Sequence, residues 1–206
     1  GLCEGINGWR DWIIAGDIHE SIWTEAELRA VRNGLLAVRD TLTGFGLNWT
    51  EEIGEGLRFR KSEQISGLGL YENNEILLRN FYAESRGFDL NEADNAFRIV
   101  IHEIGHAVDE TNGFLRNTLP GTFTYRRDPN GDFYDFSWRT TDGYYYRDYG
   151  MDQRDEGYAD AFASLVWTTA HQNGAVAVPR EYVGNPQSQL TVDWASMHSY
   201  VEDSLR

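Results

Sequence analysis

The sequence predicts a single α+β domain over residues 1–206, with a small, mostly antiparallel sheet, one central helix and further helices near the C-terminus. Two observations predict this class. Segments with the helical period of apolar residues flank a cluster of short strand-like runs between residues 47 and 79. Helix start and stop signals bound the helical segments. The length of 206 residues suits one domain with a sizeable core.

The first predicted helix covers residues 24–40. Thr24 and Glu27 have the spacing of a capping box, and apolar residues recur on one helical face after them. Strand-like runs follow at residues 47–50, 57–61, 67–71 and 76–79. Asn73 and Asn74, between the last two runs, predict a tight hairpin turn.

A central apolar helix is predicted between Asn91, an N-cap residue, and the stop signal Asn112-Gly113. Gly105 lowers the helix propensity of this segment by about 1 kcal/mol relative to Ala. We therefore expect either another backbone or the metal site to approach the helix closely at this glycine.

The remaining chain is predicted to be a long loop followed by two helices. Residues 114–150 are rich in Tyr, Phe and Trp, which indicates a structured loop surface. Helices are expected at about 156–172 and 191–205. We expect a helix-and-sheet part (about 1–113), a helical part (about 114–206) and a cleft between them.

Composition excludes several classes of function. The 33 acidic and 18 basic residues give a formal net charge of −15, which opposes general binding to nucleic acid or anionic membranes. No apolar run reaches the ~18 residues of a membrane span. Cys3 is the only cysteine, so neither an intrachain disulfide nor a multi-cysteine metal site is expected. We expect a monomer.

Residues 102–106 read His-Glu-Ile-Gly-His, inside the apolar stripe of the central helix. Histidines at positions i and i+4 share one helical face, so His102 and His106 can bind one metal ion. Glu103 points away from direct ligation but can reach a water molecule on that ion. This arrangement is what a zinc hydrolase needs, and we expect one zinc ion.

A catalytic zinc site needs a third protein ligand. Position 112 is Asn112 and position 109 is Asp109, so the extended three-histidine motif is absent. Other candidate ligands are three isolated histidines and two loop aspartates. They are His19, His171, His198, Asp142 and Asp148.

Glu156 is the favoured third ligand. Glu156 and Asp160 lie at i and i+4, so one carboxylate can bind the metal while the other accepts an N–H from a ligating imidazole. Small residues between and after them would let their helix approach the histidine helix closely. They are Gly157, Ala159, Ala161 and Ala163.

The stretches Val100-Ile-His-Glu-Ile-Gly-His-Ala-Val-Asp109 and Glu156-Gly-Tyr-Ala-Asp-Ala-Phe162 resemble the zincin metallopeptidases with a glutamate ligand. Among these, the chain is most similar to the anthrax lethal factor-like family, which includes Pro-Pro endopeptidases. The resemblance covers about residues 66–165. It implies a zincin-like catalytic domain and a secreted rather than cytoplasmic protein.

The resemblance also implies roles for individual residues. His102, His106 and Glu156 would bind zinc, and Glu103 would be the general base. Tyr149 would stabilise the oxyanion or protonate the leaving amine, although Tyr144, Tyr145 and Tyr146 could supply the same hydroxyl. Asp109 would support the metal site or be a surface acid at the helix end. An edge strand that binds extended substrate is implied at Gly67, Leu68, Gly69, Leu70 and Tyr71.

The sequence therefore predicts a zinc endopeptidase acting on protein or peptide substrates, with water activated by the metal and by Glu103. Two alternatives stay open. The first is a zinc hydrolase acting on a non-peptide amide. The second is a catalytically silent module that binds extended peptides, against which the presence of Glu103 argues.

Overall fold

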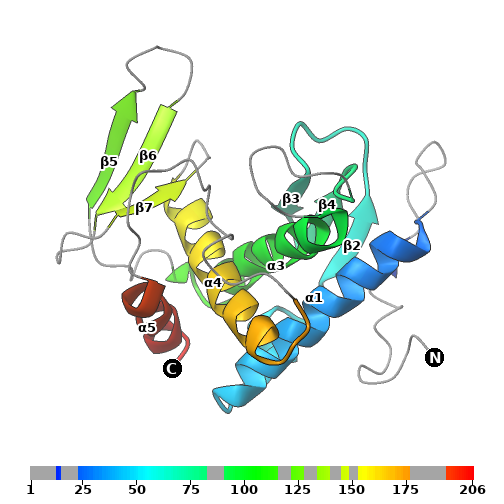
Figure 1. The fold of residues 1–206 in the computed structure, drawn as a ribbon, viewed down its shortest axis with the longest axis horizontal. Helices are drawn as coiled ribbons and strands as arrows, with labels where there is room; N and C mark the ends of the chain where they lie inside the picture. Colours follow the sequence, from blue (N-terminus) through cyan, green and yellow to red (C-terminus); the bar gives the residue numbers. More distant parts are fainter. Residues whose placement is uncertain are drawn as a thin grey trace.

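The computed structural model describes residues 13–14, 23–82, 91–115, 122–127, 134–139, 145–148, 153–176 and 194–206. These residues form an α+β fold in which helix α3 (Glu92–Thr111) lies at the centre (Figure 1). Helix α1 (Glu25–Gly44) packs on one side of α3 and helix α4 (Gln153–Gln172) on another. No helix in the described ranges is long and apolar enough to cross a membrane.

Helices α1 and α3 begin where the sequence predicts. Thr24 and Glu27 form both halves of a capping box, and the Asn91 side chain accepts a hydrogen bond from the Asp94 amide at 2.9 Å. The helix expected through about residue 40, with a stop near Thr43-Gly44, ends at Gly44 as α1. Helix α4 begins three residues earlier than expected and ends at the predicted residue. Helix α5 (Trp194–Ser204) closes the chain.

The first sheet is mixed. Its strands are β1 (Ile13–Ile14), β2 (Arg58–Lys61), β3 (Gly69–Glu72) and β4 (Glu75–Leu78), in the order β1-β2-β4-β3. Strand β2 pairs in parallel with both β1 and β4, and only β3 and β4 are antiparallel. The expectation of a mostly antiparallel sheet is therefore wrong for this sheet. After β2 the chain crosses to the sheet edge and returns as β4, instead of pairing at once.

The hairpin between β3 and β4 turns at the predicted residues. Asn73 and Asn74 have φ angles of 51° and 63°, the left-handed values that a tight two-residue turn requires. The predicted strand at residues 47–50 is wrong, because helix α2 (Trp49–Glu52) forms there. The Asn48 amide donates to Glu51 at 2.6 Å and holds this helical turn at its start.

The tract at residues 114–150 is not only a loop. It contains a second, antiparallel sheet of strands β5 (Thr122–Arg127), β6 (Tyr134–Arg139) and β7 (Tyr145–Asp148). This sheet lies at the N-terminal end of α4 (Figure 1). The expectation of a helical part at about residues 114–206 is therefore wrong, because this part also contains a sheet.

The core lies between the helices and the inner face of the first sheet. Alternate residues of β2 and β4, including Phe59, Ile76 and Leu78, are buried against the helices. Phe97 of α3 and Trp167 of α4 meet edge to face, with ring centroids 5.4 Å apart. This packing fixes α3 and α4 against each other, and both carry predicted site residues.

Candidate metal centre

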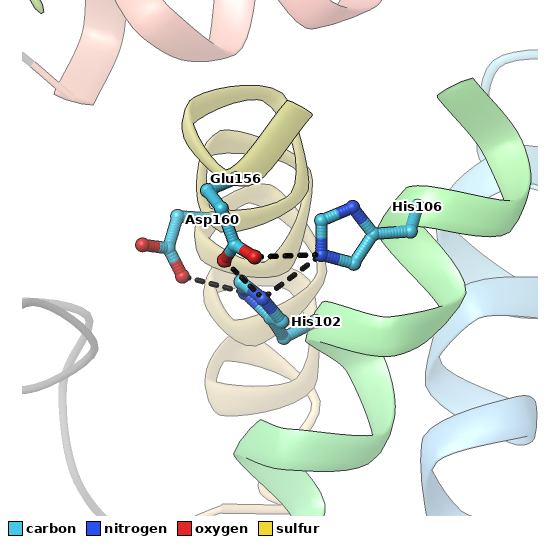
Figure 2. A network of polar contacts seen from close by, with 4 residues as sticks. All are labelled: His102, His106, Glu156 and Asp160. Carbon is cyan, nitrogen blue, oxygen red and sulfur yellow. Dashed lines mark hydrogen bonds and ion pairs between the residues drawn. The ribbon is translucent and has the colours of Figure 1, made fainter. Parts of the chain in front are cut away.

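Helix α3 presents His102 and His106 on the face that looks toward α4 (Figure 2). The Nε2 atoms of the two imidazoles lie 3.2 Å apart. Both side chains are mostly shielded from solvent, with 14% and 13% of their surface exposed. The four-residue spacing thus brings two nitrogen donors to one point.

Helix α4 brings Glu156 to the same point (Figure 2). Its Oε2 lies 3.1 Å from Nε2 of His102, and its Oε1 lies 3.7 Å from Nε2 of His106. One donor atom from each of the three residues falls within 4.8 Å of the other two. His102, His106 and Glu156 could therefore hold a metal ion between the two helices.

Asp160, one turn after Glu156, contacts the other nitrogen of His102. Its Oδ1 lies 2.7 Å from Nδ1 of His102. A carboxylate only accepts hydrogen bonds, so Nδ1–H donates and the lone pair of the neutral ring lies on Nε2. Asp160 thus directs the free nitrogen of His102 toward His106 and Glu156.

The charges of this group favour a cation. Burial opposes protonation of His102, but Asp160 and Glu156 outweigh it and raise the pKa of His102 well above its usual value. Burial also opposes ionisation of Glu156, but its hydrogen bond to His102 and the charges of His102 and His106 lower its pKa to about 2. Two carboxylates and two ring nitrogens that face each other need a positive charge among them, supplied by protons or by a metal ion.

Glu103 lies next to this group but is not one of its three donors. The side chain is buried, with 6% of the residue exposed, beside Gly69 of β3. Burial raises the pKa of Glu103 to about 7, while the charge of His102 lowers it and that of Glu156 raises it. A carboxyl group with a pKa near neutrality can both accept and return a proton at physiological pH.

Gly105 marks the closest approach of α3 to α4. A Cβ atom placed on Gly105 would lie 2.8 Å from Cα and 2.9 Å from the carbonyl oxygen of Ala159. Both distances are shorter than real Cβ contacts, so only glycine permits this crossing. The close approach expected at Gly105 is confirmed, and it comes from the backbone of the neighbouring helix.

The predicted substrate strand lies beside the same group. Residues 69–71 belong to β3, the edge strand, whereas Gly67 and Leu68 precede it. Gly69 and Tyr71 are half-buried on the side toward α3, and Leu68 and Leu70 are exposed on the opposite side. The sequence identified the strand, but nothing in it indicated that Gly69 touches Glu103.

The other described candidate residues are not among the three donors of the metal centre. Asp109 is 1% exposed, so the structure excludes a surface acid at this position. His171 Nδ1 donates to the carbonyl of Val176 at 3.0 Å, and His198 Nε2 contacts the Ser164 hydroxyl at 2.9 Å. His171 thus contacts the chain just after the end of α4, and His198 joins α5 to α4. Neither histidine belongs to the donor group.

Several predicted residues lie outside the described ranges. Tyr149, Asp142 and His19 are among them, and so are Tyr144 and Cys3. For Asp148 the structure gives the backbone of β7 but not the side chain. Their proposed or alternative roles stay predictions.

Comparisons with family models, with curated proteins and with solved structures find no significant match to this chain. The site is therefore interpreted from its own geometry and charge.

Proposed function

We propose that this chain is a zinc-dependent endopeptidase with a zincin-like active site. The observation that carries the proposal is the convergence of His102, His106 and Glu156 on one point, with Glu103 beside them. Three protein donors leave a fourth position for water, which is typical of catalytic zinc sites. Structural zinc sites instead use four protein ligands.

The spacing of the donors supports zinc. Ligands bound tetrahedrally at about 2.0–2.1 Å from an ion lie roughly 3.4 Å from one another. The two Nε2 atoms lie 3.2 Å apart, and Glu156 approaches His102 through Oε2 at 3.1 Å and His106 through Oε1 at 3.7 Å. Two imidazoles and one carboxylate are also a ligand set that zinc favours, whereas magnesium and calcium prefer oxygen alone.

The chemistry follows from these positions. A bound zinc ion would lower the pKa of a coordinated water molecule to about 7 and polarise the substrate carbonyl. Glu103 would accept the proton of the water and pass it to the departing amine. Asp160 would hold the His102 ring in the ligating orientation throughout. Tyr149 remains our proposed oxyanion donor.

Among the described residues no strand pairs with the outer edge of β3, and this supports an extended substrate. Glu72 and Glu75 close the hairpin, and the Arg79 amide donates to the Leu68 carbonyl at 2.9 Å. Because hydrogen-bonded pairs alternate in an antiparallel ladder, the N–H and C=O groups of Gly69 and Tyr71 point to the unpaired edge. A protein or peptide substrate would add a strand there, next to Glu103.

The test is a digest of casein and of a peptide library, read by mass spectrometry, with the protein zinc-loaded or treated with a chelator. We expect internal peptide-bond cleavage that the chelator abolishes and that added zinc restores. Glu103→Gln is expected to bind zinc normally and to lose nearly all hydrolysis. Normal turnover by this variant would overturn the role of Glu103.

The same digest separates the alternatives. Zinc-dependent hydrolysis of small amides without cleavage of any peptide would favour a non-peptide amidase. Peptide binding without any cleavage by the zinc-loaded protein would favour the silent binding module.

A further inference from the structure

We propose that Gly69 is a positioning residue for Glu103, and that its missing side chain leaves the space in which the Glu103 carboxylate is held. This inference rests on the proposed function for its catalytic consequence. It concerns a contact between the edge strand and the base, separate from any contact of the strand with substrate.

The geometry leaves no room for a side chain at position 69. A Cβ atom on Gly69 would lie 2.3 Å from Oε1 of Glu103, and 2.7 Å from both its Cδ and its Cγ. All three nearest atoms belong to the Glu103 side chain. Any larger residue must therefore displace Glu103 or lift β3 from α3.

The backbone itself does not demand glycine at position 69. The described glycines with positive φ are Gly46, Gly54, Gly56, Gly113 and Gly174. Gly69 has no left-handed φ and lies in an ordinary strand, where glycine lowers stability relative to residues with side chains. The steric contact with Glu103 is thus the physical reason for glycine here.

The course of strand β3 along helix α3 also accounts for the contact between Gly69 and Glu103. Tyr71 lies two residues further along the strand, on the same face, and the charge of Glu110 helps to raise its pKa. Gly69 lies beside Glu103. The strand therefore follows α3 from Glu103 toward Glu110, and position 69 always points at the base.

Packing against Gly69 acts on the position of the Glu103 carboxylate beside the charges of His102 and Arg98. Within the described part of the chain, no hydrogen bond holds the Glu103 side chain. The residue is nevertheless buried, with only 6% of its surface exposed. A carboxylate held by packing moves when the packing changes. A displacement of about 1 Å at a catalytic group is enough to lower a rate by roughly 100-fold.

The kinetic test compares Gly69→Ala with the wild-type chain, both zinc-loaded. We expect kcat to fall by roughly 100-fold while KM stays within about threefold, because the base moves but the strand edge remains. Zinc affinity should stay unchanged, since no ligand is touched. Gly44→Ala, where a Cβ meets nothing within 4 Å, is the control and should leave kcat unchanged.

A second test does not depend on activity. Gly69→Ala is introduced into the wild-type chain and into Glu103→Ala, and the unfolding midpoints of the four metal-free proteins are compared. The added methyl group should lower the midpoint only when the Glu103 side chain is present. In the Glu103→Ala chain the methyl group fills free space, so the midpoint should stay the same or rise.

The outcomes separate the two proposals. Equal midpoint shifts in the two backgrounds would overturn the positioning role of Gly69, whatever the activity of the chain. A loss of activity through KM alone would overturn it as well. A wild-type chain that cleaves no peptide would overturn the proposed function, while unequal midpoint shifts would still support the contact.

Discussion

Nδ1 of His102 donates a hydrogen bond to Asp160 across the α3–α4 interface, at 2.7 Å. This contact occupies Nδ1 of His102 and turns Nε2 toward His106 and Glu156. It also ties the two helices together on the side of the metal donors.

Asp160→Asn is expected to weaken zinc binding by about 10- to 100-fold, because the amide is a weaker acceptor and lets the His102 ring turn. Competition with a chromogenic chelator measures the affinity. Glu92→Gln, an exposed acid at the start of α3, is the matched control and should bind zinc like the wild type. Equal affinity in Asp160→Asn and the control would remove the orienting role.

Metal-free protein should lose stability through Glu103 as the pH rises. The pKa of Glu103 is about 7 in the folded chain, against 4.5 without burial. The unfolded chain therefore releases this proton first, and unfolding becomes easier between these two pH values. Relative to Glu103→Gln, the wild type should lose about 3 kcal/mol of unfolding free energy over this interval.

This pH effect is measured by denaturant unfolding in the presence of a chelator. Both proteins keep the two histidines and the remaining acids, so the contribution of these groups is largely removed in the difference. Parallel stability curves for the wild type and Glu103→Gln would show that Glu103 ionises freely in the folded chain.

Gly105→Ala should separate the helices. Its Cβ would lie 2.8 Å and 2.9 Å from backbone atoms of Ala159, which cannot move aside as a side chain can. We expect a loss of about 1–3 kcal/mol in unfolding free energy, despite the better helix propensity of Ala. Zinc affinity should fall too, because Glu156 moves with α4.

Gly44→Ala tests whether the effect of Gly105→Ala is specific to this crossing. It makes the same chemical change on a helix with open space around it, and should leave stability unchanged or raise it by up to about 1 kcal/mol through the better helix propensity of Ala. Unaltered zinc binding in Gly105→Ala would contradict the role of the crossing in setting the donor distances.

Lys61→Met should destabilise the chain strongly. Lys61 Nζ lies 2.8 Å from Oε1 of Glu27, and the two side chains are only 6% and 7% exposed. Removing the lysine leaves a buried carboxylate without its counter-charge, which costs about 3–5 kcal/mol. Thermal and denaturant unfolding measure the loss.

The exposed pair between Arg29 and Glu25 is the control for this prediction. Its side chains are 58% and 68% exposed, so Arg29→Met should cost less than about 1 kcal/mol. Similar losses in Lys61→Met and Arg29→Met would show that the buried pair is not stabilised by its own charges.

The parts of the structure that the sequence predicted are those set by local spacing. His102 and His106 are four residues apart on one helix, and so are Glu156 and Asp160, so helical geometry alone places each pair on one face. Capping residues and the Asn73-Asn74 turn are equally local. These features needed no knowledge of the tertiary fold.

The parts that the sequence missed depend on contacts between distant segments. The parallel pairing of β2 with β4 is set by where the chain returns, and alternation of side chains gives no sign of strand direction. Residues 47–50 alternate like a strand, but a helical turn forms instead, with the backbone carbonyl of Asn48 accepting from the amides of Glu51 and Glu52. The contact of Gly69 with Glu103 joins two elements whose separation no local pattern specifies.

The two-helix origin of the donors has a consequence for how the chain is held together. His102 and Glu156 are 54 positions apart, so an ion between them closes a loop of that length. Unlike a disulfide, the ion leaves the chain on unfolding, so it would stabilise the fold by binding the folded state alone, to a degree set by its affinity and concentration. With one cysteine in the sequence, no intrachain disulfide supplies such a cross-link. A bound ion would therefore stabilise the fold of this protein as well as take part in its proposed catalysis.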